Sequence, residues 1–224
     1  AGLVQYRSAD ARLLGRPEGL HGDNVYPLLS TRDGALWVST LDGGLQRWSG
    51  GDAGTWVQPA LPFEVAWSLH GARDGGLWVV GDGVCLLRDH ACSQAGMPEA
   101  MQNQPPVRLV FEDPAGRVWV GTQWALWRRE GDQWHTLSAT EGTQPGRAAR
   151  AMVAAPNDHL WLATNGDGLF EFVGGRRARQ ITTAQGLSSN ALRALWRDPD
   201  NGELWVGTEN RGLCRLRADL QPVA

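Results

Sequence analysis

Nine polar or aromatic residues follow a short strand pattern that recurs along the chain, and their types suit contact with a polar ligand. Carboxylates, amides and a guanidinium can hydrogen-bond to hydroxyl groups, and an exposed indole can stack on a sugar or aromatic ring. We therefore take the loops that carry them, together with Arg147 in a separate loop, as the candidate binding site. The nine residues are Asp42, Asp82, Gln123, Trp124, Asn165, Asp167, Glu209, Asn210 and Arg211.

Trp124 is the residue of this set with two opposed interpretations. It stands where the other loops have a small polar residue, which favours an exposed stacking platform. The alternative is that its indole packs against Trp127 or Met101 and has only a structural role.

The sequence gives little support for catalysis or metal binding. Its histidines are scattered and lack the spacing of metal ligands, and neither a Gly-x-Ser-x-Gly segment nor a phosphate-binding loop occurs. The segment 198–203 resembles a calcium loop faintly but is too short. We predict no catalytic residue, no metal and no cofactor, with one alternative left open, a hydrolase or lyase whose site is assembled from separate loops. The five histidines are His21, His70, His90, His135 and His159.

The strand that precedes each of these loops contains a tryptophan. The tryptophans are Trp37, Trp78, Trp119, Trp161 and Trp205, at intervals of 41, 41, 42 and 44 residues. Short apolar strands repeated at such a period are typical of blade repeats. Each period holds four short strands, here lettered a to d in chain order, with the tryptophan in strand b. The sequence therefore predicts an all-β fold, a β-propeller of four-stranded antiparallel blades in five repeats of about 42 residues.

The predicted boundaries make residues 1–224 a single propeller domain, which we expect to be part of a larger protein. The blade repeats span about 25–64, 65–106, 107–149, 150–190 and 191–224, and residues 1–24 supply strands c and d of a preceding or closing blade. Two arrangements fit these repeat boundaries: a closed ring of five blades, and an arc of a longer array of blades. We favour the array, because residues 2–6 resemble a surplus strand c that a closed five-bladed ring does not need.

The tryptophans themselves are predicted to lie in the core. Alternation places each indole on the same face of strand b as the residue two positions later. That residue is mostly small, as Gly121 and Gly207 illustrate, so the indole can lie flat between packed sheets. The arginines at the end of strand c, Arg47, Arg128 and Arg215, are predicted to form structural ion pairs with the acidic a–b turns.

Composition excludes several classes of function. The net charge is −3 and no block of basic residues occurs, so nucleic acid is not an expected partner. No apolar run approaches the roughly 20 residues of a membrane-spanning helix, and we predict no membrane insertion in this segment. The chain opens at Ala1 without a signal peptide, so targeting does not give its compartment.

Two of the three cysteines, Cys85 and Cys92, bracket a predicted hairpin between strands c and d of the second repeat. With Arg88 and Asp89 as the turn, the two cysteines face each other at a separation near disulfide reach. The sequence leaves open whether they form a bridge, which would indicate an oxidising compartment, or are two small buried hydrophobic residues.

The repeat resembles the two-component regulator propeller family. In that pattern a turn with an acidic residue and glycine precedes Leu-Trp-Val-Gly-Thr and then Gly-Leu-x-Arg, as in residues 198–215. The first and third repeats match at many positions. The second and fourth depart from it: Gly81-Asp82 replaces Gly-Thr, and Glu171 replaces the arginine.

The resemblance implies an extracytoplasmic, periplasmic sensor domain of a bacterial receptor whose output module is a histidine kinase or a diguanylate cyclase. Its expected partners are a small-molecule or oligosaccharide ligand on the loop face and the neighbouring domains of the same receptor, with a dimer formed through the parent protein. Two alternatives are a stand-alone lectin-like propeller and a protein–protein interaction scaffold. The loops differ in sequence from blade to blade, which argues against the repeated, equivalent sugar sites of such a lectin.

Overall fold

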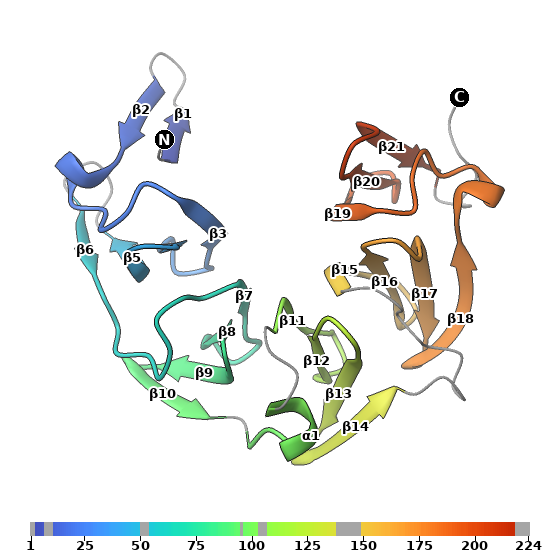
Figure 1. Cartoon of the computed structure of the whole chain (residues 1–224), viewed down its shortest axis with the longest axis horizontal. Coiled ribbons are helices and arrows are strands. Elements are labelled where there is room, and N and C mark those ends of the chain that lie inside the picture. Colours follow the sequence, from blue (N-terminus) through green and yellow to red (C-terminus); the bar gives the residue numbers. More distant parts are fainter. Residues whose placement is uncertain are drawn as a thin grey trace. The chain divides into compact units, whose positions relative to one another are not determined.

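The computed structural model describes residues 3–6, 11–49, 54–94, 96–102, 107–137 and 149–217. The chain divides into two compact units, Ala1–Gln102 and Asn103–Ala224. Both units are built from antiparallel sheets whose strands follow one another in chain order (Figure 1). We call each sheet of three or four described strands a blade.

The first unit contains one two-stranded sheet, two four-stranded blades and a short helix, α1 (Glu99–Gln102). The two-stranded sheet pairs the two segments predicted as strands c and d at the start of the chain. Its strands are β1 (Leu3–Tyr6) and β2 (Ala11–Leu14). The first blade comprises β3 (Val25–Ser30), β4 (Leu36–Thr40), β5 (Gly44–Ser49) and β6 (Thr55–Val57). The second comprises β7 (Ser68–Gly71), β8 (Leu77–Val80), β9 (Val84–Arg88) and β10 (Ala91–Gln94).

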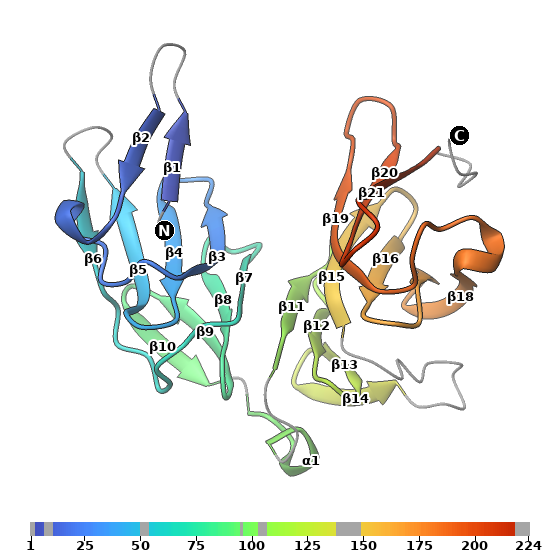
Figure 2. The ribbon, with the colours of Figure 1, turned by 45° about the horizontal axis from the view of Figure 1, so that its top comes forward.

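The second unit contains two four-stranded blades and one of three described strands. The third blade is β11 (Leu109–Glu112), β12 (Val118–Gly121), β13 (Leu126–Glu130) and β14 (Gln133–Leu137). The fourth is β15 (Ala149–Ala155), β16 (His159–Thr164), β17 (Leu169–Val173) and β18 (Arg176–Ile181). The fifth is β19 (Leu192–Arg197), β20 (Leu204–Thr208) and β21 (Leu213–Leu216). The a strands β11, β15 and β19 lie side by side (Figure 2).

Two details of the second blade differ from the prediction. Strand a begins at Ser68, three residues after the predicted start of the repeat at residue 65, although Trp67 N still donates to Val80 O at 2.6 Å, which extends the ladder by one bond. The c–d turn is formed by Asp89 and His90, both with positive φ, and not by Arg88 and Asp89. Positive φ at both turn residues fits the twist of a two-residue hairpin.

Because the turn lies one residue later than predicted, the cross-strand pairing shifts by two residues, and Cys85 lies opposite Gln94 instead of Cys92. Cys92 lies opposite Leu87, so the two cysteines are diagonal neighbours. They are nevertheless joined by a disulfide. Of the two alternatives that the sequence left open, the bridge is the one that forms.

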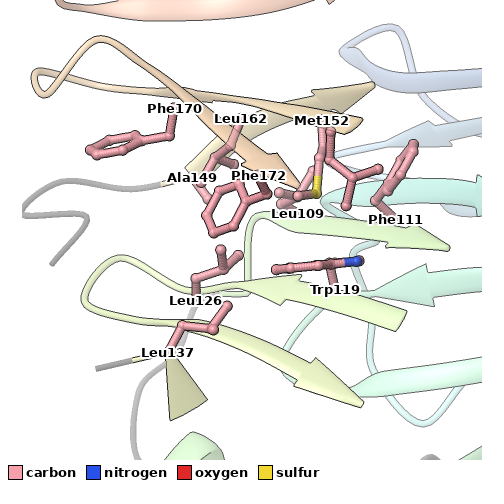
Figure 3. Packing of buried hydrophobic residues seen from close by; sticks show 11 residues of the cluster. Leu109, Phe111, Trp119, Leu126, Leu137, Ala149, Met152, Leu162, Phe170 and Phe172 are labelled. Carbon is pink, nitrogen blue, oxygen red and sulfur yellow. The ribbon is translucent and has the colours of Figure 1, made fainter. Parts of the chain in front are cut away.

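Blade stacking buries the strand-b tryptophans. Trp119 is 0% exposed, and its ring centroid lies 5.3 Å from that of Phe172 in the next blade. Figure 3 shows the side chains of the fourth blade, Phe172 and Met152 among them, pointing at those of the third. Trp161 packs in the same way against Leu204 and Val206 of the fifth blade.

The predicted core role is confirmed for four of the five tryptophans. Trp37, Trp78, Trp119 and Trp161 are buried, whereas Trp205 is only partly buried. Trp196 lies opposite Trp205 on the neighbouring strand β19, and its side chain is exposed. The physical reason is that the described part of the second unit has no strand after β21 to stack on this face.

The predicted ion pairs between strand c and the acidic turn form in two of the three named cases. Arg47 Nη2 lies 2.8 Å from Asp33 Oδ2 and Arg215 Nε lies 3.9 Å from Glu203 Oε1. Arg128 instead pairs with Glu130 and donates to Gly175 O of the next blade. In each case the guanidinium also lies over the strand-b indole, with 5.6–5.8 Å between the guanidinium carbon and the ring centroid.

In the fourth blade an arginine also lies over the strand-b indole, but it belongs to strand d instead of strand c. Glu171 stands on strand c, and Arg179 lies opposite it on strand d. Arg179 Nε donates to Glu171 Oε2 at 2.5 Å, and the guanidinium carbon lies 5.6 Å from the Trp161 ring centroid. Arg179 therefore takes over the position above the indole that a strand-c arginine occupies in the first, third and fifth blades.

The contribution of the Asp33 carboxylate in the first a–b turn to stability should depend on pH. A hydrogen bond from Thr31 Oγ1 and a second from Arg47 lower the pKa of Asp33 from 3.8 to about 2. A pKa depressed in the folded state stabilises the protein above the unfolded value, and this contribution is lost as pH falls from about 4 towards 2. Because the Asp33 side chain is 56% exposed, we expect Asp33→Asn to lower the free energy of unfolding by less than about 1 kcal/mol.

The measurement is urea denaturation of both proteins at pH 6 and pH 2. The difference between them should be present at pH 6 and mostly lost at pH 2. A difference of equal size at both pH values would show that the carboxylate charge does not contribute.

Candidate functional site

The b–c and d–a loops lie together at one end of the blades, which we call the loop face. In the first unit the d–a loop meets the b–c loop so closely that a Cβ on Gly43 would lie 2.6 Å from His21. In the second unit Asn190 O accepts hydrogen bonds from Gly166 N and Gly168 N, and Ala191 O accepts one from Glu209 N. These backbone bonds hold the fourth and fifth b–c loops on either side of one d–a loop.

The loop face of the first unit carries two of the predicted residues. Asp42 is exposed and pairs with Arg16, with 2.5 Å between Oδ2 and Nη2, and Arg16 also contacts Asp23 at 3.4 Å. Asp82 is exposed at the tip of the second b–c loop. Asp42 is therefore engaged by a neighbouring loop of its own unit, and the carboxylate of Asp82 faces solvent.

Trp124 is exposed, which overturns the packed alternative. Its side chain is 65% exposed at the tip of the third b–c loop, beside the exposed Gln123. The loop is held by Thr122, whose Oγ1 accepts from Trp124 N at 3.2 Å and from Ala125 N at 3.0 Å. The indole is thus presented to solvent on a fixed turn, at little entropic cost to a ligand that stacks on it.

The structure brings Asn165 and Glu209 together from two different blades. In the amide orientation that matches donors to acceptors, Asn165 donates to Glu209 Oε2 at 2.9 Å and accepts from Arg150 Nη2 at 3.2 Å. Glu209 also pairs with Arg193. We call Arg150, Asn165, Arg193 and Glu209 the bulge cluster, for the reason that follows.

Both arginines of the bulge cluster occupy β-bulges in strand a. The β15–β16 register shifts between Ala149 and Ala151, and the β19–β20 register shifts between Leu192 and Ala194. Arg150 and Arg193 are the extra residues at these shifts. A bulge changes the direction in which a side chain points, and here each arginine meets a loop residue. The sequence prediction missed both arginines, although each is the second residue of its strand a.

The remaining predicted residues surround this cluster or fall outside the described chain. Asp167 shares its loop with Asn165, and its main chain is held by Thr164 Oγ1 and Gln180 Nε2. One carboxylate oxygen of Asp167 is buried and has no hydrogen-bond partner among the residues that the structure describes. Asn210 and Arg211 are exposed at the tip of the fifth b–c loop. Arg147 lies outside the described residues.

Other chemistry-bearing groups lie away from the loop face. His159 Nδ1 is 2.8 Å from Glu171 Oε1, at the opposite end of β16 from Thr164. Among the described residues, no three histidine, cysteine, aspartate or glutamate side chains gather closely enough to hold a metal ion. None of the described helices has the length and apolar character needed to cross a membrane.

Comparison with known proteins agrees with the sequence resemblance. The profile of the two-component regulator propeller family matches residues 101–124, from α1 to Trp124. This segment of the chain is therefore similar to a two-component regulator propeller repeat. The match includes strands a and b of the third blade and the loop that presents Trp124. No curated protein matches the chain in sequence.

Solved structures show the fold that surrounds this repeat. The extracellular domain of a putative hybrid two-component system from B. thetaiotaomicron is 19% identical, with a TM-score of 0.70 over 91% of this chain and 28% of that chain. Virginiamycin B lyase from Staphylococcus aureus is 13% identical, with a TM-score of 0.69 over 89% of this chain and 69% of that one. The WD40 β-propeller domain of Doa1 is 12% identical, with a TM-score of 0.67 over 88% of this chain and 66% of that one.

At identities this low, the similarity shows the fold alone. The structural similarity confirms the all-β propeller predicted from the sequence. This chain spans 28% of the length of the hybrid two-component domain that it resembles.

Proposed function

We propose that this chain is an extracytoplasmic sensor propeller of a bacterial signalling receptor, and that its loop face binds a small molecule or an oligosaccharide. The observation that carries the proposal is the bulge cluster, in which Arg150 and Arg193 leave the regular ladder to meet Asn165 and Glu209. Bulges beside functional sites commonly re-aim side chains in this way.

The chemistry of the cluster suits a ligand rich in hydroxyl groups. Guanidinium groups donate hydrogen bonds, the Glu209 carboxylate accepts them, and the Asn165 amide does both. The exposed indole of Trp124 adds an apolar platform on the loop face of the same unit. Such a combination of few polar groups and one aromatic surface is what fixes the orientation of a sugar.

The location is supported by the disulfide and by the likeness to an extracellular domain. The Cys85–Cys92 bridge fits an oxidising compartment. A similar solved structure is the extracellular domain of a putative hybrid two-component system. The output module of the parent receptor, and a dimer formed through it, belong to the same proposal.

The test is thermal unfolding of the chain against a panel of neutral and acidic oligosaccharides. A ligand at a hundred times its dissociation constant adds about 2.7 kcal/mol, which raises the midpoint by roughly 5–10 °C for a chain of this size. We expect Arg193→Ala to weaken binding about tenfold or more, because a charged hydrogen bond is lost, and Trp124→Ala to weaken it as well.

The matched control is Arg197→Ala, which removes an arginine from the far end of the same strand. It should bind like the parent protein. A panel without any shift, or equal losses in Arg193→Ala and Arg197→Ala, would count against a loop-face site.

A further inference from the structure

The first unit has a hollow on its own loop face that the proposed oligosaccharide site does not use. It has a volume of about 540 Å³ and lies along the d–a loop that runs from β6 to β7. This volume falls within the range of small-molecule sites. Residues that line it include Leu45, Gln58, Pro59, Leu61, Phe63 and Glu64.

The hollow is held open by close contacts with two b–c loops. Gln58 Nε2 donates to Gly43 O at 3.2 Å. A Cβ on Gly81 would lie 2.4 Å from the Phe63 ring and 2.4 Å from Val65 O. Phe63 therefore rests directly on the backbone of the second b–c loop, in a position that only glycine at residue 81 permits.

The walls are also stiff. Pro59 and Pro62 fix two backbone φ angles within the loop, and Pro59 is buried. Leu45 belongs to the core between the first two blades. A site whose walls are fixed before binding loses little entropy when a ligand enters.

The side chains that line the hollow are apolar except for those of Gln58 and Glu64, and only Glu64 is charged. Glu64 is exposed, and within the described chain no arginine forms an ion pair with it at salt-bridge distance. Asp82 adds a second negative charge on the loop whose Gly81 contacts Phe63. The hollow therefore combines several apolar side chains with an unneutralised carboxylate at its edge.

We propose that this hollow is a separate binding site for a small apolar molecule that carries one protonated amine. The apolar body contacts Leu61, Phe63 and the prolines, and the ammonium group pairs with Glu64. This proposal does not depend on the oligosaccharide site in the second unit, because it uses no residue of the bulge cluster.

The probe is 2-phenylethylamine, compared with the uncharged 2-phenylethanol, each titrated into the ¹⁵N-labelled chain and followed by NMR. We expect the amine to shift the amide signals of Ala60, Leu61 and Phe63. It should bind about twofold to fivefold more tightly than the alcohol, as an exposed ion pair allows. Glu64→Gln should remove this preference without changing the binding of the alcohol.

Glu99→Gln is the matched control, because it removes the same charge from an exposed position elsewhere in the first unit. It should keep the preference for the amine, and so should Trp124→Ala, which separates this site from the oligosaccharide site. Equal binding of amine and alcohol, a preference that survives Glu64→Gln, or no shift of the loop signals with either probe would overturn the proposal.

Discussion

Replacing Asp113 with alanine is expected to lower the free energy of unfolding by about 3–5 kcal/mol. The Asp113 carboxylate is fully buried. It accepts hydrogen bonds from Trp119 Nε1 at 2.8 Å and from Arg117 Nε at 2.6 Å. It also accepts from the backbone amides of Ala115 and Arg117. Its loss leaves the buried indole N–H without an acceptor and the turn without its organising group.

The comparison that tests this account is Asp198→Ala. Asp198 occupies the same place in the backbone of the fifth a–b turn, since Asp198 N donates to Glu203 O as Asp113 N donates to Arg117 O. Its carboxylate accepts from Asp200 N at 2.9 Å, and within the described part of the chain the Trp205 indole nitrogen has no hydrogen-bond partner. We expect a loss below about 1 kcal/mol, measured for both variants by guanidinium denaturation.

If Asp113→Ala and Asp198→Ala lowered the free energy of unfolding by equal amounts, the proposed difference between the two turns would be refuted. It would then follow that the turn itself, and not the bond from the indole to the carboxylate, contributes the stability.

Gly121→Ala is expected to destabilise the second unit by about 1–3 kcal/mol, as overpacking of a core commonly does. A Cβ at residue 121 would lie 2.5 Å from Ala149 Cβ in the fourth blade and 3.1 Å from Leu109 Cβ. The third and fourth blades must separate to admit it. Urea denaturation followed by tryptophan fluorescence measures the loss.

Gly207→Ala is the matched control, because Gly207 has the same position two residues after the strand-b tryptophan. The nearest atom to its added Cβ, Ala194 Cβ, lies at 3.4 Å, an ordinary contact. We expect no loss and a gain of up to about 1 kcal/mol from the reduced freedom of the unfolded chain. If Gly207→Ala proved as damaging as Gly121→Ala, stacking of the next blade would not be the cause.

The candidate site was predictable in part from the sequence. The period of the tryptophans predicts that the b–c loops lie at one end of the blades, and from it we predicted that Asn165, Glu209 and Trp124 lie on the loop face, where the structure places them. The sequence did not identify Arg150 or Arg193. A bulge is a local shift of hydrogen-bond register between two strands, and neither strand taken alone records it.

By itself the sequence determined the blade repeat, most strand positions and the core role of four tryptophans, because these follow from alternation and turn chemistry within about ten residues. Only the tertiary structure decided which tryptophan is left partly exposed, since that depends on whether another blade covers it. It also decided that Arg179 replaces the missing strand-c arginine, and that Cys85 and Cys92 bridge across a diagonal. Each of these outcomes depends on contacts between strands or blades, and those contacts are formed only when the sheets pair and stack.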